Sequence, residues 1–190
     1  MAGKDKMNLE IFKVVCKAFS QSDNLDGMAN HFVQLLVGAM EIKGSTIFIL
    51  NDETKELIRL ASFGLSPSYL NKGPVMADSG ICALIEKKPI IVRDINADDR
   101  LEYPDEARKE GIGAIVSICI PFQEHIIGGL RLYHHRPWDI SDHDLDYLLI
   151  MVEHVGLAMM LTRILGNLWS INEAMADLPP ELAPFLGRDK

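Results

Sequence analysis

The chain has 190 residues, of which 48% are hydrophobic and 24% charged, a composition typical of a soluble globular protein with one core. Its formal net charge of −8 disfavours nucleic-acid binding, because such proteins gather basic side chains on one face. The three widely spaced cysteines and an N-terminus without an apolar signal segment predict a cytoplasmic protein with reduced thiols.

The first third of the sequence predicts two helices and a β-hairpin. Apolar residues recur at helical spacing in Lys6–Phe19 and again in Leu25–Met40. The segments Ser45–Leu50 and Leu57–Phe63 are rich in strand-forming residues and flank the polar turn "NDETKE". This change of period predicts a hairpin after the two helices.

The middle of the chain contains shorter elements. The segment "GLSPSYLNKGP" predicts a loop, because it is punctuated by Gly and Pro. A short helix in "SGICALIEKK" and a short strand in "PIIVRDI" follow. Tyr103–Glu110 predicts another short helix, since Pro104 suits its first turn and Gly111 its left-handed end.

A second hairpin and a long helix complete the pattern. The strands are predicted at Gly113–Phe122 and Ile126–His135, around a turn at Gln123–His125. Ser141 is the predicted N-cap of a helix that runs to about Ile164, with a helical pattern continuing as far as "LPPELAP". Its most apolar part, Tyr147–Thr162, is shorter than the roughly 20 residues that cross a bilayer, so no membrane association is expected.

This order predicts an α+β fold, similar to an α/β sandwich. Strands joined mainly as hairpins imply a central, mainly antiparallel sheet of five to six strands. The long N- and C-terminal helices are expected on one face, and the short helices and loops on the other. Loops and short helices cover a sheet less completely than long helices, so a ligand pocket is expected on their side.

Strand alternation predicts which side chains face this pocket. In each strand of the second hairpin, an almost wholly apolar set alternates with a mixed set, and the mixed set suits the loop-covered face. The candidates are Ser117, Cys119, Arg131 and Tyr133. Arg131 is the best candidate for anion recognition, because its planar fork holds a carboxylate or phosphate bidentately. Alternatively, Arg131 reaches solvent at the sheet edge or pairs with an acid such as Glu110. Tyr69 and Tyr103 are candidate lid residues, with ordinary loop packing as the alternative.

Three segments resemble the GAF domain family. They are "GSTIFILNDETKELIRLASFGLSPSYL", "DSGICALIEKKPIIVRDINADDR" and "GIGAIVSICIPFQEHIIGGLRLYHHRPWDISDHDLDYLLIMVEHVGLAM". Their order and spacing follow the family pattern from about Asn8 to Arg163. The resemblance implies a cytoplasmic, GAF/PAS-like sensory domain that dimerises and holds a small molecule over the sheet. We therefore expect a GAF domain at residues 1–165 and a C-terminal helical extension and tail at residues 166–190.

The resemblance leaves the cofactor unknown. Cyclic-nucleotide-binding members carry an Asn-Lys pair where this chain has His134 and His135. Asp94–Gly111 lacks the cysteine that bilin attachment requires. The two histidines are not expected to share a metal, because successive strand residues point to opposite faces and they belong at the rim near Trp138. We expect no metal, haem or covalently attached bilin.

Cys82 supports a catalytic alternative. Free-methionine-sulfoxide reductases are GAF enzymes with a cysteine in a Gly-x-Cys context, as in Gly80-Ile81-Cys82. Such chemistry needs a nucleophilic thiolate and a resolving thiol, and Asp98–Glu110 contains no cysteine. The leading hypothesis is therefore a non-catalytic sensory domain of bacterial-type signal transduction, with Cys82 as a candidate pocket residue. The alternatives are a reductase that uses Cys82 and a dimerisation scaffold without a ligand.

The final helix predicts a homodimer. One apolar stripe contains Leu148, Val152, Val155, Met159 and Thr162, and a second contains Leu149, Gly156 and Met160. A helix that is apolar on more than one side must bury more than one side. One stripe is expected on the sheet and the other on a second copy, joined by Leu9, Phe12, Cys16 and Phe19 of the first helix. The remaining expected partners are an unidentified small molecule and a separate output protein.

Overall fold

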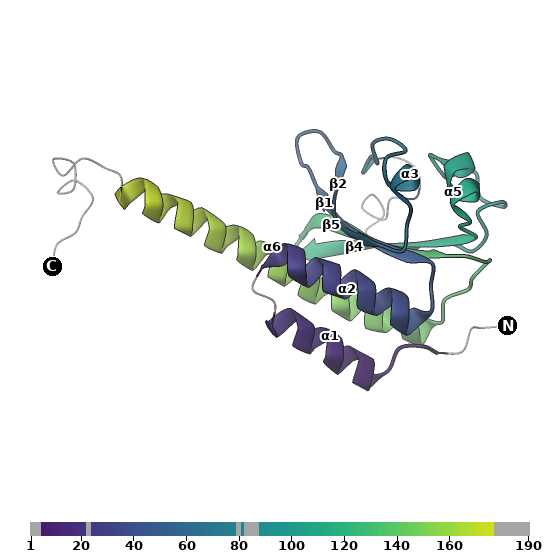
Figure 1. Cartoon of the computed structure of the whole chain (residues 1–190), viewed down its shortest axis with the longest axis horizontal. Coiled ribbons are helices and arrows are strands. Elements are labelled where there is room, and N and C mark those ends of the chain that lie inside the picture. Colours follow the sequence, from purple (N-terminus) through teal and green to yellow (C-terminus); the bar gives the residue numbers. More distant parts are fainter. Residues whose placement is uncertain (1–4, 22–23, 79–80, 82–87, 177–190) are drawn as a thin grey trace.

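The computed structural model describes residues 5–21, 24–78, 81 and 88–176. Figure 1 shows a sheet with helices on both sides and one helix that extends far beyond it. The helices are α1 (Leu9–Gln21), α2 (Leu25–Met40), α3 (Pro67–Leu70), α5 (Pro104–Glu110) and α6 (Asp142–Ala176). The strands are β1 (Gly44–Leu50), β2 (Leu57–Phe63), β3 (Ile90–Val92), β4 (Ala114–Phe122) and β5 (His125–His134).

The five strands form one sheet in the order β2-β1-β5-β4-β3. Every neighbouring pair is antiparallel, which confirms the predicted α+β fold with a mainly antiparallel sheet. β5 lies between β1 and β4, so its side chains project from the middle of the sheet. β2 and β3 form the two edges.

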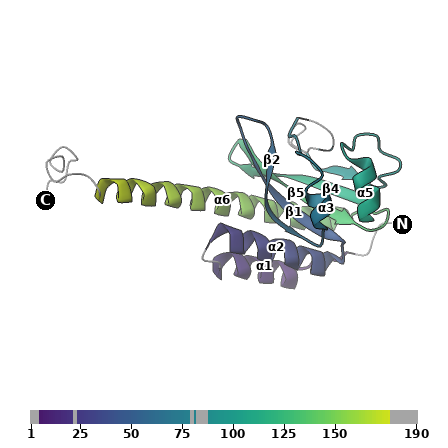
Figure 2. The ribbon, with the colours of Figure 1, turned by 45° about the horizontal axis from the view of Figure 1, so that its top comes forward.

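One face of the sheet is covered by long helices. α2 packs on β1 and β2, and α6 packs on β4 and β5. α1 lies on the outer side of α2 and α6, as both views show (Figure 1, Figure 2). The main core fills this side, and its largest fully buried members include Phe32, Leu36, Ile47, Ile118, Leu130, Leu132 and Leu148. The apolar sets of β4 and β5 therefore face the helices, as strand alternation predicts.

The opposite face has a thinner cover of α3, α5 and loops (Figure 1). Its buried residues form two smaller clusters, one around Tyr69 and Tyr133 and one around Phe48 and Val75. α3 occupies a segment predicted as a loop, because four residues are too few to show a helical period. The predicted helix in "SGICALIEKK" lies almost entirely outside the described residues.

The N-terminal segment is tied to the start of α6 by Asp144. As predicted, Ser141 caps this helix, and its hydroxyl accepts a hydrogen bond from the Asp144 amide at 3.2 Å. The buried Asp144 carboxylate accepts hydrogen bonds from the amides of Lys6, at 3.0 and 3.1 Å, and Met7, at 2.7 Å. This contact fixes the entry of the chain into α1.

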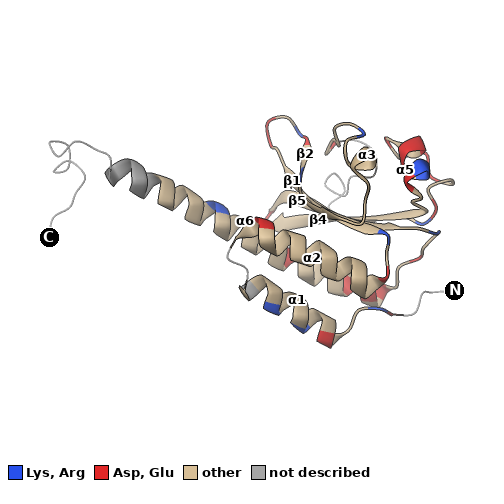
Figure 3. Cartoon of the chain, viewed as in Figure 1, with Lys and Arg blue, Asp and Glu red and all other residues tan. Residues whose placement is uncertain are grey.

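α6 joins the predicted final helix and the predicted helical extension into one element. It continues without interruption through residues 165 and 166 and ends at Ala176. All of residues 161–170 are exposed, and Figure 3 shows how few charges the protruding part carries. Among the described residues, one helical segment, Asp142–Ser170, has the length and the apolar composition needed to cross a membrane. This judgement rests on length and composition alone, and 33% of the most apolar window of the segment is buried inside the structure. That buried part belongs to the core beneath β4 and β5.

Candidate ligand-binding site over the sheet

A polar row crosses the middle of the thinly covered face. Ser62, Thr46, Arg131 and Ser117 occupy paired positions on β2, β1, β5 and β4. The hydroxyl oxygens of Thr46 and Ser62 are hydrogen bonded at 2.9 Å. Three of these residues are almost fully buried, because Thr46, Ser117 and Arg131 are 1, 3 and 6% exposed. A buried row of this kind needs hydrogen-bond partners from above the sheet.

Arg131 is only partly satisfied, because its side chain is hydrogen bonded to Tyr133 but two of its nitrogens lack partners. Among the described residues, neither its Nε nor its Nη2 has a hydrogen-bond acceptor. Its Cζ lies 5.6 Å from the centre of the Phe48 ring, so the guanidinium packs against an aromatic face. The solvent-exposed alternative for Arg131 is wrong, because β5 is an interior strand and the side chain is buried.

The alternative pairing of Arg131 with Glu110 is wrong as well. The Glu110 carboxylate forms an ion pair with Lys43 at 3.2 Å and accepts hydrogen bonds from the amide and hydroxyl of Ser66. Burial raises the pKa of Glu110, but the bonds from Ser66 and Lys43 outweigh this effect and hold the pKa below its usual range. Glu110 is therefore ionised and already satisfied.

A cavity of about 200 Å³ opens above the part of this row that lies on β1. Thr46 and Tyr133, which are close neighbours of Arg131 in the sheet, line its floor. The walls combine polar groups with aromatic and apolar side chains. They include Phe48, Leu57, Tyr69, Leu70 and Val75. Arg131 lies directly behind this lining and does not itself line the cavity. The side chains in between screen charge less than water does, so the guanidinium charge still acts on the cavity.

Two tyrosines form an aromatic pair at the cavity. The rings of Tyr69 and Tyr133 meet edge to face, with centroids 5.8 Å apart. Burial raises the pKa of both phenols well above the usual range. For Tyr133, the side chains of Arg131 and Thr46 oppose this rise by charge and hydrogen bonding. Both phenols therefore stay neutral and keep their hydroxyl protons.

Lys72 supplies a second cation at the cavity. Its ammonium lies 3.9 Å from the centre of the Tyr69 ring and donates a hydrogen bond to the Tyr69 carbonyl at 3.3 Å. Burial lowers the pKa of Lys72 to about 8, and the charges of Arg131 and Arg59 add to the effect. Glu102 partly offsets them. A lowered lysine pKa indicates an ammonium that lacks enough negative charge around it.

The fold and this cavity can be compared with known proteins. The family model for the GAF domain matches residues 22–160. The chain belongs to the GAF domain family. No curated protein sequence matches it.

Solved structures of other GAF domains share the fold of this one. The GAF domain of a phosphoenolpyruvate-protein phosphotransferase from Coxiella burnetii has a TM-score of 0.78 at 19% identity, covering 86% of this chain and 99% of that one. The equivalent domain from Acinetobacter has a TM-score of 0.73 at 14% identity, with the same coverage. Free methionine-R-sulfoxide reductase from Neisseria meningitidis, solved with its substrate, has a TM-score of 0.71 at 14% identity, covering 86% and 95%. The fold is thus common to regulatory domains and to enzymes.

The predicted pocket residues of this GAF domain divide into three groups. Arg131, Tyr133 and Tyr69 lie at or directly behind the cavity, and Ser117 lies beside Arg131 in the polar row. Tyr103 acts from the rim, where its hydroxyl donates to the Pro74 carbonyl at 2.7 Å.

Two predicted residues lie elsewhere. Cys119 lines a separate cavity of about 510 Å³ near Pro121 and Leu149, at the hairpin end of β4. Cys82 lies outside the described residues. Among the described residues, the structure therefore places no thiol at the cavity of Arg131.

Sequence reasoning missed most of the residues that line the cavity, among them two of β1 and two cations. Thr46 and Phe48 belong to β1, whose facing side follows only from its pairing with β5. Arg59 and Lys72 belong to the edge strand β2 and to the loop after α3. For Thr46 and Phe48, the alternation in "STIFIL" was an available signal. No local pattern identifies the two cations.

The histidine pair lies at the rim near Trp138, as predicted. β5 ends at His134, and the imidazole rings of His134 and His135 stack with centroids 4.4 Å apart. The His134 ring also stacks on Trp138 at 5.2 Å, and its Nδ1 contacts the backbone of Arg136. The pair thus belongs to a surface aromatic stack at the rim, where the chain leaves the sheet.

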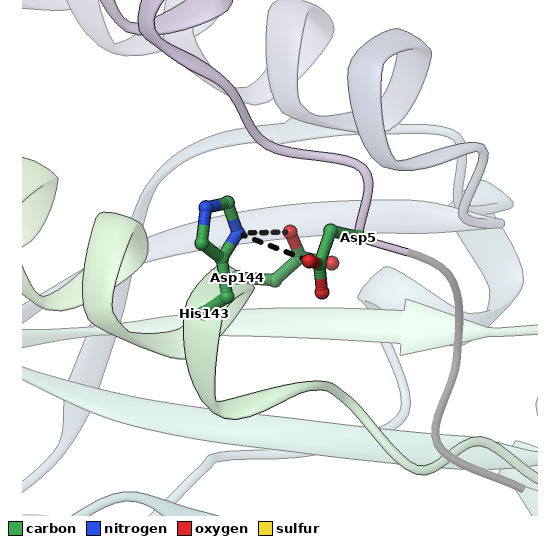
Figure 4. Close-up of side chains that lie close together, drawn as sticks. All are labelled: Asp5, His143 and Asp144. Carbon is green, nitrogen blue, oxygen red and sulfur yellow. Dashed lines mark ion pairs between the residues drawn. The ribbon is translucent and has the colours of Figure 1, made fainter.

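Figure 4 shows one cluster of potential metal ligands in the described residues, formed by Asp5, His143 and Asp144. The His143 Nδ1 lies 3.6 Å from Asp144 Oδ1 and 4.0 Å from Asp5 Oδ2. However, the Asp144 carboxylate already accepts hydrogen bonds from two backbone amides. The cluster serves to anchor the N-terminal segment on α6.

Proposed function

We propose that this GAF domain is a non-catalytic sensory domain of cytoplasmic, bacterial-type signal transduction. It binds a small molecule in the cavity over the sheet and signals through its terminal helices in a homodimer. The observation that carries the proposal is the cavity of about 200 Å³ beside a buried Arg131 whose Nε and Nη2 lack acceptors among the described residues. Polar groups that converge on an apolar hollow are the usual composition of a small-molecule site.

The protruding helix α6 supports the dimer. Its exposed apolar residues Ile150, Leu157, Leu161, Ile164 and Leu168 are each 45–59% exposed. They follow one another in steps of seven, four, three and four residues, the heptad spacing of a coiled coil. Arg163 is the single charged residue between Val155 and Asn172. A second copy of α6 would bury this stripe.

The exposed apolar stripe of α6 differs from the second stripe predicted from the sequence, which contains Leu149, Gly156 and Met160. Gly156 lies against β4, where an added Cβ would stand 2.0 Å from the Pro121 carbonyl oxygen. Leu149 is half-buried near the same hairpin. The predicted second stripe therefore faces the domain, and the stripe that includes Leu157 and Leu161 is the one available to a partner.

α1 would extend the same interface. The Phe12 ring contacts the rings of Tyr147 and His154 at the start of α6, with centroids 5.9 and 6.2 Å apart. On the same helix, Leu9 is 56% exposed. An interface of α1 and the first half of α6 would therefore include Leu9 beside the coiled coil.

The sheet links the two sites. Arg131 and Tyr133 face the cavity from β5, while Leu130 and Leu132 of the same strand pack against the helix-covered core. Ligand binding favours whichever helix arrangement gives the higher affinity, and the signal is a shift between populations.

Thermal unfolding of the full chain against a broad metabolite panel tests the proposal. We expect at least one compound to raise the melting temperature and to alter the sedimentation of the dimer. A panel without any such compound favours the ligand-free scaffold. For the reductase alternative, the test is reduction of free methionine sulfoxide by the wild type and by Cys82→Ser. We expect no turnover from either, and turnover that is lost in Cys82→Ser would identify an enzyme.

A further inference from the structure

We propose that the cavity over the sheet takes a small organic anion, in which a carboxylate or phosphate group lies between Arg131 and Lys72 and an apolar body contacts the aromatic walls. This inference rests on the proposed function and names the class of ligand for the same site. It makes no claim about the dimer.

The first argument is the distribution of ion pairs. Arg59 and Lys72 line the cavity and Arg131 lies behind it. Among the described residues, none of the three has a carboxylate within ion-pair distance. Arg59 is exposed and donates a hydrogen bond to the Leu70 carbonyl at 3.0 Å, so the two cations that bear on the ligand are the buried Arg131 and the half-buried Lys72. Two such cations at one cavity favour an anion from outside the chain.

The second argument is the burial of Arg131. A buried charge is expensive unless it is paired and hydrogen bonded, and each unsatisfied buried N–H adds to the cost. Arg131 is 6% exposed, and its Nε and Nη2 lack acceptors in the described part of the chain. These two nitrogens form one edge of the guanidinium fork, which matches the two oxygens of a carboxylate or phosphate. Neighbouring side chains cover both nitrogens, so an anion that binds this edge must displace part of the cavity lining.

The third argument is the remaining chemistry of the lining. The neutral hydroxyl of Tyr69 can donate a hydrogen bond to an anion, whereas those of Thr46 and Tyr133 already have side-chain partners. Phe48 and Val75 offer apolar contact, and a volume of about 200 Å³ restricts the ligand to a small molecule. Glu56 is the one acid among the described lining residues, so the cations outnumber it.

The test compares matched anionic and neutral probes. Titration calorimetry of the full chain would use benzoate, phenyl phosphate and the neutral isostere benzamide. We expect at least one anion to bind about tenfold or more tightly than benzamide, and its affinity to fall about tenfold or more in Arg131→Met. Arg131→Lys keeps the charge and should bind with intermediate affinity. Arg136→Met removes an exposed arginine at the end of β5 and should bind like the wild type.

Each outcome decides one of the two hypotheses. Equal binding of benzoate and benzamide, or an Arg131→Met variant that is folded by circular dichroism and binds anions unchanged, overturns the anion inference but leaves a ligand-binding domain. Failure of both anions to bind at about 10 mM also overturns the inference, and the metabolite panel then judges the proposed function separately. The tighter of benzoate and phenyl phosphate assigns the carboxylate or the phosphate class.

Discussion

At the scale of single residues, Arg131 is a position where stability is given up for binding. Replacement of a buried, unpaired ion by an apolar side chain of similar length is often stabilising by about 1–4 kcal/mol. We therefore expect Arg131→Met to raise the free energy of unfolding of the unliganded protein within that range, as measured by urea denaturation. Arg136→Met should stay within about 0.5 kcal/mol of the wild type. A clear loss of stability in Arg131→Met would show that the guanidinium has internal partners.

Lys72 gives the site a pH dependence with a definite sign. Its pKa of about 8 lies below the usual value, because burial and the nearby charges of Arg131 and Arg59 outweigh those of Glu102 and Glu106. An anion binds the protonated form, so its affinity should be constant below about pH 7.5 and fall as pH rises through 8. The dissociation constant should rise up to about tenfold per pH unit.

Calorimetric titration of the bound anion between about pH 7 and 10 checks this dependence. Lys72→Met should bind more weakly at pH 7 and should lack the slope above pH 8. A wild-type affinity that does not change across this range would contradict the role of Lys72.

The sequence predicts part of this site for a clear physical reason. The period of two places Arg131 and Tyr133 on one face of β5 and Ser117 on the same face of β4 without any knowledge of the fold. It does not reveal that Thr46 pairs with Arg131, because strand pairing between β1 and β5 joins segments about 80 residues apart. The contact of Lys72 with Tyr69 depends on a loop conformation that no periodic pattern encodes.

At the scale of elements, the contact of Asp144 with Lys6 and Met7 fixes the start of the chain on α6. Asp144→Ala leaves two backbone amides without their acceptor, and should lower the free energy of unfolding by about 1–3 kcal/mol. Hydrogen exchange at the amides of residues 6 and 7 should accelerate. Asp146→Ala removes an exposed acid from the same helix and should change neither quantity appreciably. Unchanged exchange in Asp144→Ala would contradict the anchoring role.

The crossing of α6 over β4 depends on Gly156. Because an added Cβ would lie 2.0 Å from the Pro121 carbonyl oxygen, Gly156→Ala should destabilise the domain by about 1–3 kcal/mol. Gly166 lies in the same helix with nothing within 4 Å of an added Cβ. Gly166→Ala should therefore stabilise the protein by up to about 1 kcal/mol through helix propensity. Urea denaturation of both variants checks the contrast, and equal effects would contradict the close packing.

The sequence predicts an element well when the element is long enough to show an apolar repeat, and it fails when the element is shorter than that. α2 and β2 have their predicted bounds, because each contains a clear apolar repeat. α3 was missed because a helix of four residues has no repeat to detect. The apolar pattern of α6 continues beyond the domain, so a periodic signal alone could not show where burial ends and exposure begins.

At the scale of the whole molecule, the two sides of the sheet have different tasks. Long helices build the core and the proposed dimer on one side, and short elements enclose the cavity on the other (Figure 2). If α6 forms a coiled coil, a charge on its apolar stripe must break the dimer. We expect the double variant Leu161→Glu, Leu168→Glu to sediment as a monomer at micromolar concentration, where the wild type is dimeric. Ser170→Glu lies off the stripe and should remain dimeric. A monomeric wild type would contradict this interface.

The asymmetry of the sheet also explains why ligand identity does not follow from the fold. The fold of this chain leaves a hollow over the strands, but the charge around it depends on individual side chains such as Arg131 and Lys72. In this chain those side chains are cationic and lack acidic partners among the described residues.

The most direct test of the central claim is a crystal structure of the purified protein at a resolution that shows the contacts of Arg131. The account predicts an anion from outside the chain, within hydrogen-bond distance of the guanidinium, in the cavity lined by Tyr69 and Lys72. A carboxylate of the chain itself paired with Arg131, or a cavity filled by side chains, would contradict it.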